Sequence, residues 1–149
     1  MDRESLKRAF TGFIDWAKAE LGDSAKTVAG IAESIGVISG EEIEFVIVPP
    51  AVLINLADIT VKTAGLAPIT WYYDTSWSIL VIAESLPDMQ SGYAVCLAIV
   101  EKLISALLEN PPPQILEPTN LRASFAFAGE GIVGMEITFE ATIKNMTGS

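Results

Sequence analysis

The segment from Val133 to Lys144 alternates apolar and polar residues with a period of two. A β-strand points successive side chains to opposite faces of a sheet, so this period predicts a strand with one core face. A helix with the same sequence would expose half of its apolar side chains to water. The fold must therefore include a sheet with a core on one side and water or a partner on the other. The predicted core face contains Val133, Met135, Ile137, Phe139, Ala141 and Ile143.

The segment before this strand repeats the same period and ends in turn-forming residues. Apolar residues stand at alternate positions from Leu121 to Phe127, and the sequence AGEG separates the two periodic runs. Short links that contain glycine are typical of β-hairpins. The last element of the fold is therefore predicted to be a hairpin.

The hairpin region also contains a G-x-G-x-x-G string at Gly129, Gly131 and Gly134. Such a string binds dinucleotides when a helix follows it, because the pyrophosphate rests on the helix N-terminus. Here the residues that follow have the period of a strand, and Glu130 would place a carboxylate beside the phosphates. The string therefore predicts a turn, and Gly134 lies on the polar face, where we expect another backbone to approach closely.

Three segments have the period of a helix. From Ser5 to Leu21, apolar residues recur at steps of three and four and predict an amphipathic helix. A shorter helix is expected from Val28 to about Gly36. A third, long helix follows an N-cap at Asp88 or Ser91 and ends at the sequence NPPPQ, because proline does not continue a helix. Its apolar stripe contains Tyr93, Cys96, Leu97, Val100, Leu103, Ile104, Leu107 and Leu108.

Strands are expected between the second and third helices. The segment Ile43 to Val48 is β-prone, and its strand must stop at the two prolines that follow or lie on a sheet edge. The next run, Ala51 to Lys62, is apolar at both parities, which predicts an inner strand covered on both faces over much of its length. Thr63 to Asp74 predicts a long connection, and strand character resumes at Thr75.

These elements predict an α+β fold. Its sheet is mostly antiparallel and is packed by the N-terminal helix and by the long helix between the central strands and the C-terminal hairpin. A chain of 149 residues favours one domain, so we expect a single domain over residues 1–149.

Composition excludes several classes of function. Nine Lys and Arg against nineteen Asp and Glu give a net charge of -10, which repels a phosphate backbone. We therefore expect no binding of nucleic acid, although DNA can slide past a surface that repels it. The sequence has no histidine and one cysteine, so imidazole catalysis and the usual zinc sites are absent. We expect no catalytic residues, no cofactor and no metal.

Hydrophobic residues make up 50% of the chain, and we expect part of this apolar surface to contact partners. The best apolar run, Phe45 to Ile54, is shorter than the roughly 20 residues of a membrane span and contains two prolines. The N-terminal sequence lacks the apolar core of a signal peptide. We therefore predict a soluble protein that resides in a reducing compartment and has no membrane partner.

The remaining candidates for chemistry have simpler structural interpretations. The glutamates of Glu41–Glu44 lack the spaced ligands of a calcium loop and are expected on a solvated face. Glu136 and Glu140 share one strand face, but about 13 Å separates their Cα atoms. That separation exceeds the usual spacing of a glycosidase pair. Cys96 lies on the apolar stripe of the long helix, and no histidine is present to activate it.

The aromatic group Trp71, Tyr72 and Tyr73, with Trp77 nearby, is a candidate contact surface. Three consecutive aromatics in an extended segment cannot all face one core. Trp and Tyr are favoured in protein interfaces, so we expect partner contact here, with local packing over the sheet as the alternative.

From Pro49 to Asn145 the chain resembles a known family in the order and texture of its elements. The strand PPAVLINLADI, the strand TSWSILVIAES, the helix SGYAVCLAIVEKLISALL and the hairpin LRASFAFAGEGIVGMEITFEATIKN follow one another. This order is similar to that of the Mu-like tail proteins of contractile-tailed bacteriophages and prophages, which look like tail terminators related to the lambda-type tail terminator.

The resemblance implies a non-enzymatic virion protein that forms a ring, usually a hexamer. Such a ring caps the finished tail tube, ends its polymerisation and joins the tail to the neck or head while DNA passes through without specific binding. The implied partners are further copies of the chain, the tail tube and sheath proteins, and a neck or head-completion protein. The implied location is the tail-neck junction of a virion assembled in the host bacterial cytoplasm. The candidate contact residues are Trp71, Tyr72, Tyr73, Glu130 and Gly134.

Two alternatives remain. A small-ligand-binding α/β domain without catalysis would have a pocket between the sheet and the third helix, lined by Trp77, Tyr93 and Leu97. The second alternative is an enzyme that uses only carboxylates for catalysis, and the sequence favours this alternative least.

Overall fold

The computed structural model describes residues 4–31, 35–39, 42–45, 47–64, 70–85 and 88–144. Its helical elements are α1 (Ser5–Leu21), the short 3-10 helix η1 (Gly22–Ser24) and α2 (Met89–Glu109). Its strands are β1 (Thr27–Gly30), β2 (Ile35–Ser39), β3 (Glu42–Phe45), β4 (Ala51–Ala64), β5 (Thr70–Glu84), β6 (Leu116–Gly129) and β7 (Ile132–Lys144).

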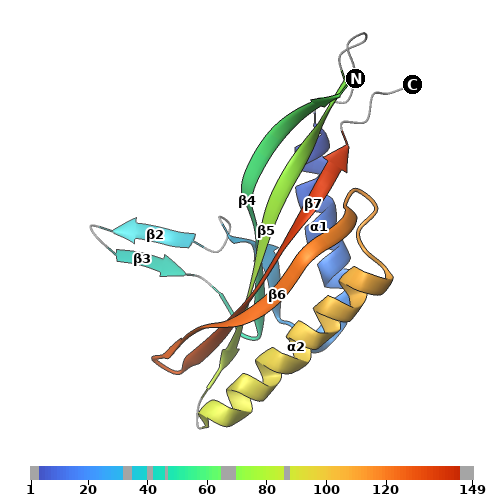
Figure 1. Cartoon of the computed structure of the whole chain (residues 1–149). Coiled ribbons are helices and arrows are strands. Elements are labelled where there is room, and N and C mark those ends of the chain that lie inside the picture. The colour runs from blue at the N-terminus through green and yellow to red at the C-terminus, as the bar shows by residue number, and fades with distance from the viewer. Residues whose placement is uncertain are drawn as a thin grey trace.

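Five of the strands form one sheet, in the order β1-β4-β5-β7-β6. The β1–β4 pair is parallel, and every other neighbouring pair in this sheet is antiparallel. Helices α1 and α2 lie together on one face of the sheet (Figure 1). The predicted α+β fold, with a mostly antiparallel sheet, an N-terminal helix and a helix before the C-terminal hairpin, is confirmed.

The core lies between this sheet face and the two helices, and stacked aromatic rings form its centre. The Phe13 ring of α1 stacks on Trp77 with 5.0 Å between centroids, and Trp77 and Phe139 are 6.2 Å apart and nearly parallel. The indole Nε1 of Trp77 donates a hydrogen bond to Thr75 Oγ1, whose hydroxyl donates to the carbonyl of Ala141. The buried polar atoms of this cluster are thus paired, as a buried Trp requires.

The predicted alternation of β7 is confirmed. Its odd-numbered residues from Val133 to Ile143 are buried against the helices. The stripe predicted for α1 is also confirmed over Ser5–Leu21, with Leu6 and Phe10 at its partly buried margin.

The second helix predicted near Val28 is wrong. Thr27–Gly30 is strand β1, which pairs in parallel with Ala51–Ile54 of β4. Gly30 lies so close to α1 that a Cβ built on it would be 2.6 Å from the Phe10 ring. The helix prediction rested on four apolar positions that span only about two turns, Val28, Ile31, Ala32 and Ile35. The ladder with β4 outweighs this weak local preference.

A two-stranded sheet, β2–β3, follows β1 and stands clear of the main sheet (Figure 1). The strand predicted from Ile43 to Val48 corresponds to β3, which ends at Phe45 before the two prolines.

Strand β4 begins at Ala51 and lies inside the sheet, as predicted. Only its first four residues, Ala51–Ile54, are buried on both faces, and from Ala57 to Thr63 the side chains are exposed. The long connection predicted from Thr63 to Asp74 is wrong in extent, because β5 begins at Thr70 and pairs with β4 up to Ala64. The aromatic run therefore belongs to a strand, where β-branched and aromatic residues are favoured.

Helix α2 begins after Asp88, which resolves the choice between two N-caps. Asp88 Oδ1 accepts from the backbone amide of Gln90, and its Oδ2 accepts from the hydroxyl of Ser91. At the other end, α2 stops at Glu109 before the prolines, as predicted. The indole of Trp16 in α1 donates to the Asn110 carbonyl over 2.7 Å and joins the two helices there.

Candidate partner-contact surfaces

The glycine string forms a hairpin turn between β6 and β7, as the alternation predicted. Glu130 and Gly131 occupy the two turn positions with φ values of 53° and 83°. These are the left-handed values of a type I′ turn, which glycine adopts without a steric penalty. Because a strand and not a helix follows, the turn has no helix N-terminus to receive a phosphate. Glu130 is exposed at the tip.

Gly134 lies on the sheet face opposite the helices, beneath the ring of Phe127 from the neighbouring strand. A Cβ built on Gly134 would be 2.6 Å from Phe127 Cε1. The close approach expected at Gly134 is therefore made by a side chain of the same chain and not by another backbone. The sequence alternation predicted Phe127 on the same face as Phe125, but a register shift between these two residues turns Phe127 to the opposite face, so this contact had no signal in the sequence.

A concavity of about 630 Å³ opens on this second sheet face beside Phe127. It crosses the start of β4, the end of β5 and the β6–β7 turn. Leu53 and Ile82 form its buried floor, and the walls are half-buried side chains. The lining residues are Ile47, Pro49, Leu53, Leu80, Ile82, Glu84, Phe127, Glu130, Gly131 and Ile132. We call this feature the apolar concavity. Apolar residues at both parities of β4 and β5 were its signal in the sequence.

The remainder of the same sheet face is polar and acidic, and neither helix covers it. Ser78 donates to Glu136, Thr142 donates to Asp74, and Asn120 donates to Glu140. Asp58, Asp74, Glu117, Glu136 and Glu140 supply the carboxylates of this region, which we call the acidic half. Among the described side chains, Lys62 and Arg122 are the cations that point to this sheet face, so the region has a net negative charge.

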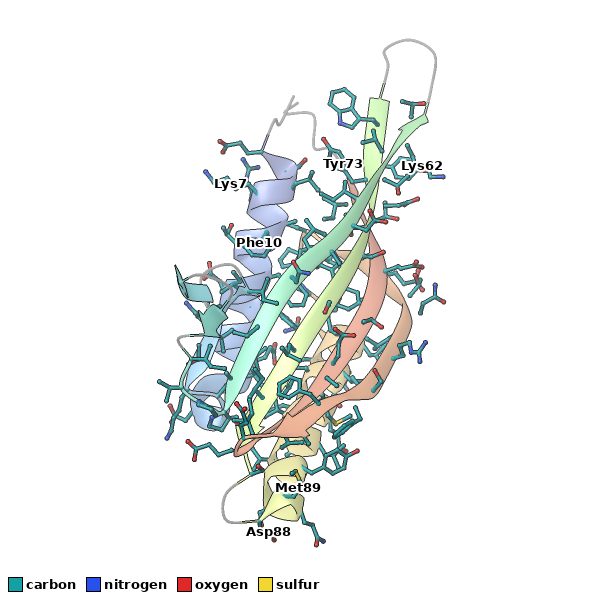
Figure 2. The ribbon with its side chains drawn as sticks, turned by 90° about the vertical axis from the view of Figure 1, so that its left-hand side faces the viewer. Lys7, Phe10, Lys62, Tyr73, Asp88 and Met89 are labelled. Atoms are coloured by element: carbon teal, nitrogen blue, oxygen red, sulfur yellow. The ribbon has the colours of Figure 1, made fainter. Side chains whose placement is uncertain are left out.

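The predicted contact residues Trp71, Tyr72 and Tyr73 lie at the far end of the β4–β5 hairpin and do not share one face. Trp71 and Tyr73 face the helix side, where the Trp71 indole donates to the Tyr73 hydroxyl over 3.0 Å, and Tyr72 pairs with Lys62 on the other side. Figure 2 shows this hairpin extending beyond the first turn of α1, with Tyr73 and Lys62 on opposite sides of the sheet.

Beside Trp71 and Tyr73, β4 exposes two apolar side chains. Ile59 is 42% exposed and Val61 is 59% exposed, on the parity that pairs with Thr75 and Tyr73. A β-bulge between Leu56 and Asp58 shifts the parity and brings them to the helix side. We call Ile59, Val61, Trp71 and Tyr73 the distal strip.

A second uncovered apolar strip runs along α2. Leu97 and Leu108 are 41% and 64% exposed, and Phe125 of edge strand β6 is 56% exposed with its ring 6.3 Å from that of Tyr93. Because Tyr93, Leu97, Ile104 and Leu108 recur at steps of four and seven, they follow one side of the helix. We call these four residues and Phe125 the helix strip. The sequence predicted one apolar stripe along this helix, but only part of that stripe reaches the sheet.

By length and composition alone, α2 passes as a candidate membrane span. Its residues Cys96, Ile99, Val100, Leu103 and Leu107 are buried against the sheet, which is how the core helix of a domain packs.

Cys96 is fully buried, and its thiol points at the carbonyls of Val81 and Val133. Burial raises the pKa of the thiol, which keeps it protonated and unreactive. Among the described residues, no group of His, Cys, Asp and Glu is arranged to hold a metal ion.

The three residues of the alternative ligand pocket have separate surroundings. Trp77 is 1% exposed within the aromatic stack, Tyr93 contacts Phe125, and Leu97 is on the surface. The glutamates of β3, Glu42 and Glu44, and the preceding Glu41 lie outside the described side chains.

No protein-family model matches the chain, and no curated protein sequence matches it.

Proposed function

We propose that this protein is a structural subunit that assembles into a ring and caps a bacteriophage tail tube at its junction with the neck. The observation that carries the proposal is the pair of uncovered apolar strips on one subunit. The distal strip and the helix strip are different surfaces. In Figure 1 the far end of the β4–β5 hairpin lies at the top of the molecule and α2 lies at the bottom.

Two different exposed apolar surfaces on one subunit favour a head-to-tail contact between subunits. In such a contact one surface of each subunit meets the other surface of the next, and rotation closes the series into a ring. A two-fold dimer would instead bury the same surface twice and leave the second strip exposed. Exposed apolar side chains at these positions are what a ring would cover.

The charge distribution supports a channel for DNA. The chain carries a net charge of -10, and the acidic half concentrates carboxylates on a face that the helices leave open. A wall of this charge repels phosphate and lets DNA pass without binding. The element order from Pro49 to Asn145, which resembles that of tail terminators, supports the same assignment. The proposal includes assembly in the host bacterial cytoplasm and no enzymatic activity.

The test is the state of assembly of the purified chain, with and without tail tubes. Light scattering and negative-stain microscopy should show rings at high protein concentration or on tubes. Val61→Glu in the distal strip and Leu108→Glu in the helix strip should each raise the protein concentration needed for assembly at least tenfold, because each substitution buries a charge at the contact.

Thr60→Glu is the matched control, since it adds the same charge to the opposite face of the same strand. It should assemble like the native chain. A chain that stays monomeric at every concentration and ignores tail tubes would overturn the proposal.

A second candidate, a small-ligand-binding domain, is favoured by the apolar concavity, whose 630 Å³ lies in the range of ligand pockets. Thermal-shift screening separates the two candidates. A ligand selective for the folded state raises Tm at fixed protein concentration, whereas ring assembly makes Tm depend on that concentration.

A further inference from the structure

The apolar concavity has a chemical character that neither ring strip shares. Its walls are Ile47, Leu80, Phe127 and Ile132, all half-buried, and Glu84 and Glu130 stand exposed at its rim. Glu84 ends β5, and Glu130 is at the tip of the β6–β7 turn. Apolar walls with carboxylates at the edge suit a ligand that has an apolar body and a positive charge.

The two rim carboxylates are available to such a charge. Within the described part of the chain, neither Glu84 nor Glu130 forms an ion pair. The Phe127 ring, which lies over Gly134, gives the concavity an aromatic wall. A cation that reaches Glu84 or Glu130 from within the concavity would also pass beside that wall, where aromatic faces attract cations.

Charge complementarity selects a different protein over a second copy of this chain. Each copy carries a net charge of -10, so a second copy brings further negative charge to a rim that is already negative. On β4, the strand that carries Ile59 and Val61 of the distal strip, the described cation is Lys62, which lies on the opposite sheet face in the same acidic region as Asp58 and Asp74. The occupant is better matched by a segment richer in Lys or Arg.

We propose that the apolar concavity binds an apolar segment of a partner protein through its hydrophobic side chains, while a Lys or Arg of that segment pairs with Glu84 and Glu130. This inference stands on the concavity and holds whether or not the subunits form a ring.

The experiment is an unbiased peptide selection. A library of random dodecapeptides displayed on particles is selected against the full native chain, and fluorescence anisotropy then measures the affinity of each recovered peptide. Recovered peptides should combine apolar residues with Lys or Arg and lack Asp and Glu. Glu84→Gln and Glu130→Gln should each weaken binding about two- to fivefold, which is typical of exposed ion pairs.

Further variants localise the contact. Leu80→Glu places a charge in the apolar wall and should weaken binding at least tenfold, and its thermal unfolding shows whether the fold is kept. Glu101→Gln on α2 is the matched control and should leave the affinity unchanged, because Glu101 lies on the other side of the sheet. The double variant Glu84→Lys with Glu130→Lys tests charge without entering the core. It should prefer a peptide whose Lys has been replaced by Glu.

Three results would overturn the inference. One is a selection that yields no binder, and another is a set of binders that keep their affinity on both Leu80→Glu and the charge-reversed variant. The third is self-association of the native chain that Leu80→Glu or charge reversal abolishes, because the concavity would then bind a second copy. Since Val61→Glu tests the ring at a separate surface, failure of one proposal is distinguishable from failure of the other.

Discussion

At the scale of single residues, close packing decides which glycines are replaceable. Gly92, in the first turn of α2, lies against the end of β5, and a Cβ built on it would be 2.5 Å from the Glu84 carbonyl oxygen and 2.8 Å from Ser85 Cα. Both atoms belong to backbone. Gly12 in α1 has a Cβ position 2.8 Å from the Gln114 Oε1, the far end of a side chain that can move.

These two glycines give a matched prediction. Gly92→Ala should lower the free energy of unfolding by about 1 to 3 kcal/mol, because overpacking against backbone exceeds the gain in helix propensity. Gly12→Ala should be neutral or stabilise by up to about 1 kcal/mol. Urea unfolding of both variants measures this difference, and an equal effect of the two substitutions would contradict the packing argument.

At the scale of elements, strong periodicity predicted what the chain builds, and weak periodicity did not. The helix Ser5–Leu21, the long helix before the prolines and the alternating strand β7 all appear as predicted, because each buries one full face. The helix expected at Val28 is instead strand β1, because β4 offers it a parallel ladder that local sequence does not reveal.

The sequence indicated only part of the surface around Trp71, Tyr72 and Tyr73. Trp71 and Tyr73 share a face and Tyr72 lies on the other, as alternation along a strand requires. Their exposed neighbours Ile59 and Val61 escaped prediction, because the bulge that reorients them leaves no clear signal in the sequence.

The β6–β7 hairpin makes an element-scale prediction about the apolar concavity. Gly134→Ala places a methyl group against the Phe127 ring, which is a side chain and is able to turn away. The cost in unfolding free energy should therefore be under about 1.5 kcal/mol, while the ring leaves its place over the strand. NMR shifts of the Phe127 ring and of Ile132 measure the movement. Unchanged shifts together with unchanged stability would show that the contact is not tight.

At the scale of the whole molecule, charge opposes the assembly that the apolar strips favour. Subunits of net charge -10 repel one another, and salt screens exposed charges. Raising sodium chloride from about 0.1 M to about 1 M shortens the screening length from about 10 Å to about 3 Å. The fraction of subunits in rings should rise accordingly at fixed protein concentration.

Sedimentation velocity at the two salt concentrations measures this effect. The Val61→Glu variant serves as the control and should sediment as a monomer at both, which separates ring formation from general aggregation. Rings that dissociate in high salt would show that the contact is held by opposite charges and not by the apolar strips.

The α+β class, the alternation of β7, the hairpin turn at Gly131 and the lack of histidine follow from the amino-acid sequence alone, because each depends on residue types at short spacing. Which apolar residues remain uncovered depends instead on packing between elements that are distant in the sequence. Leu97 and Leu108 belong to the same periodic helix as Leu103, yet the sheet reaches only one side of that helix. The apolar concavity likewise exists because β4, β5 and the β6–β7 turn, which are distant in sequence, meet at one corner of the sheet.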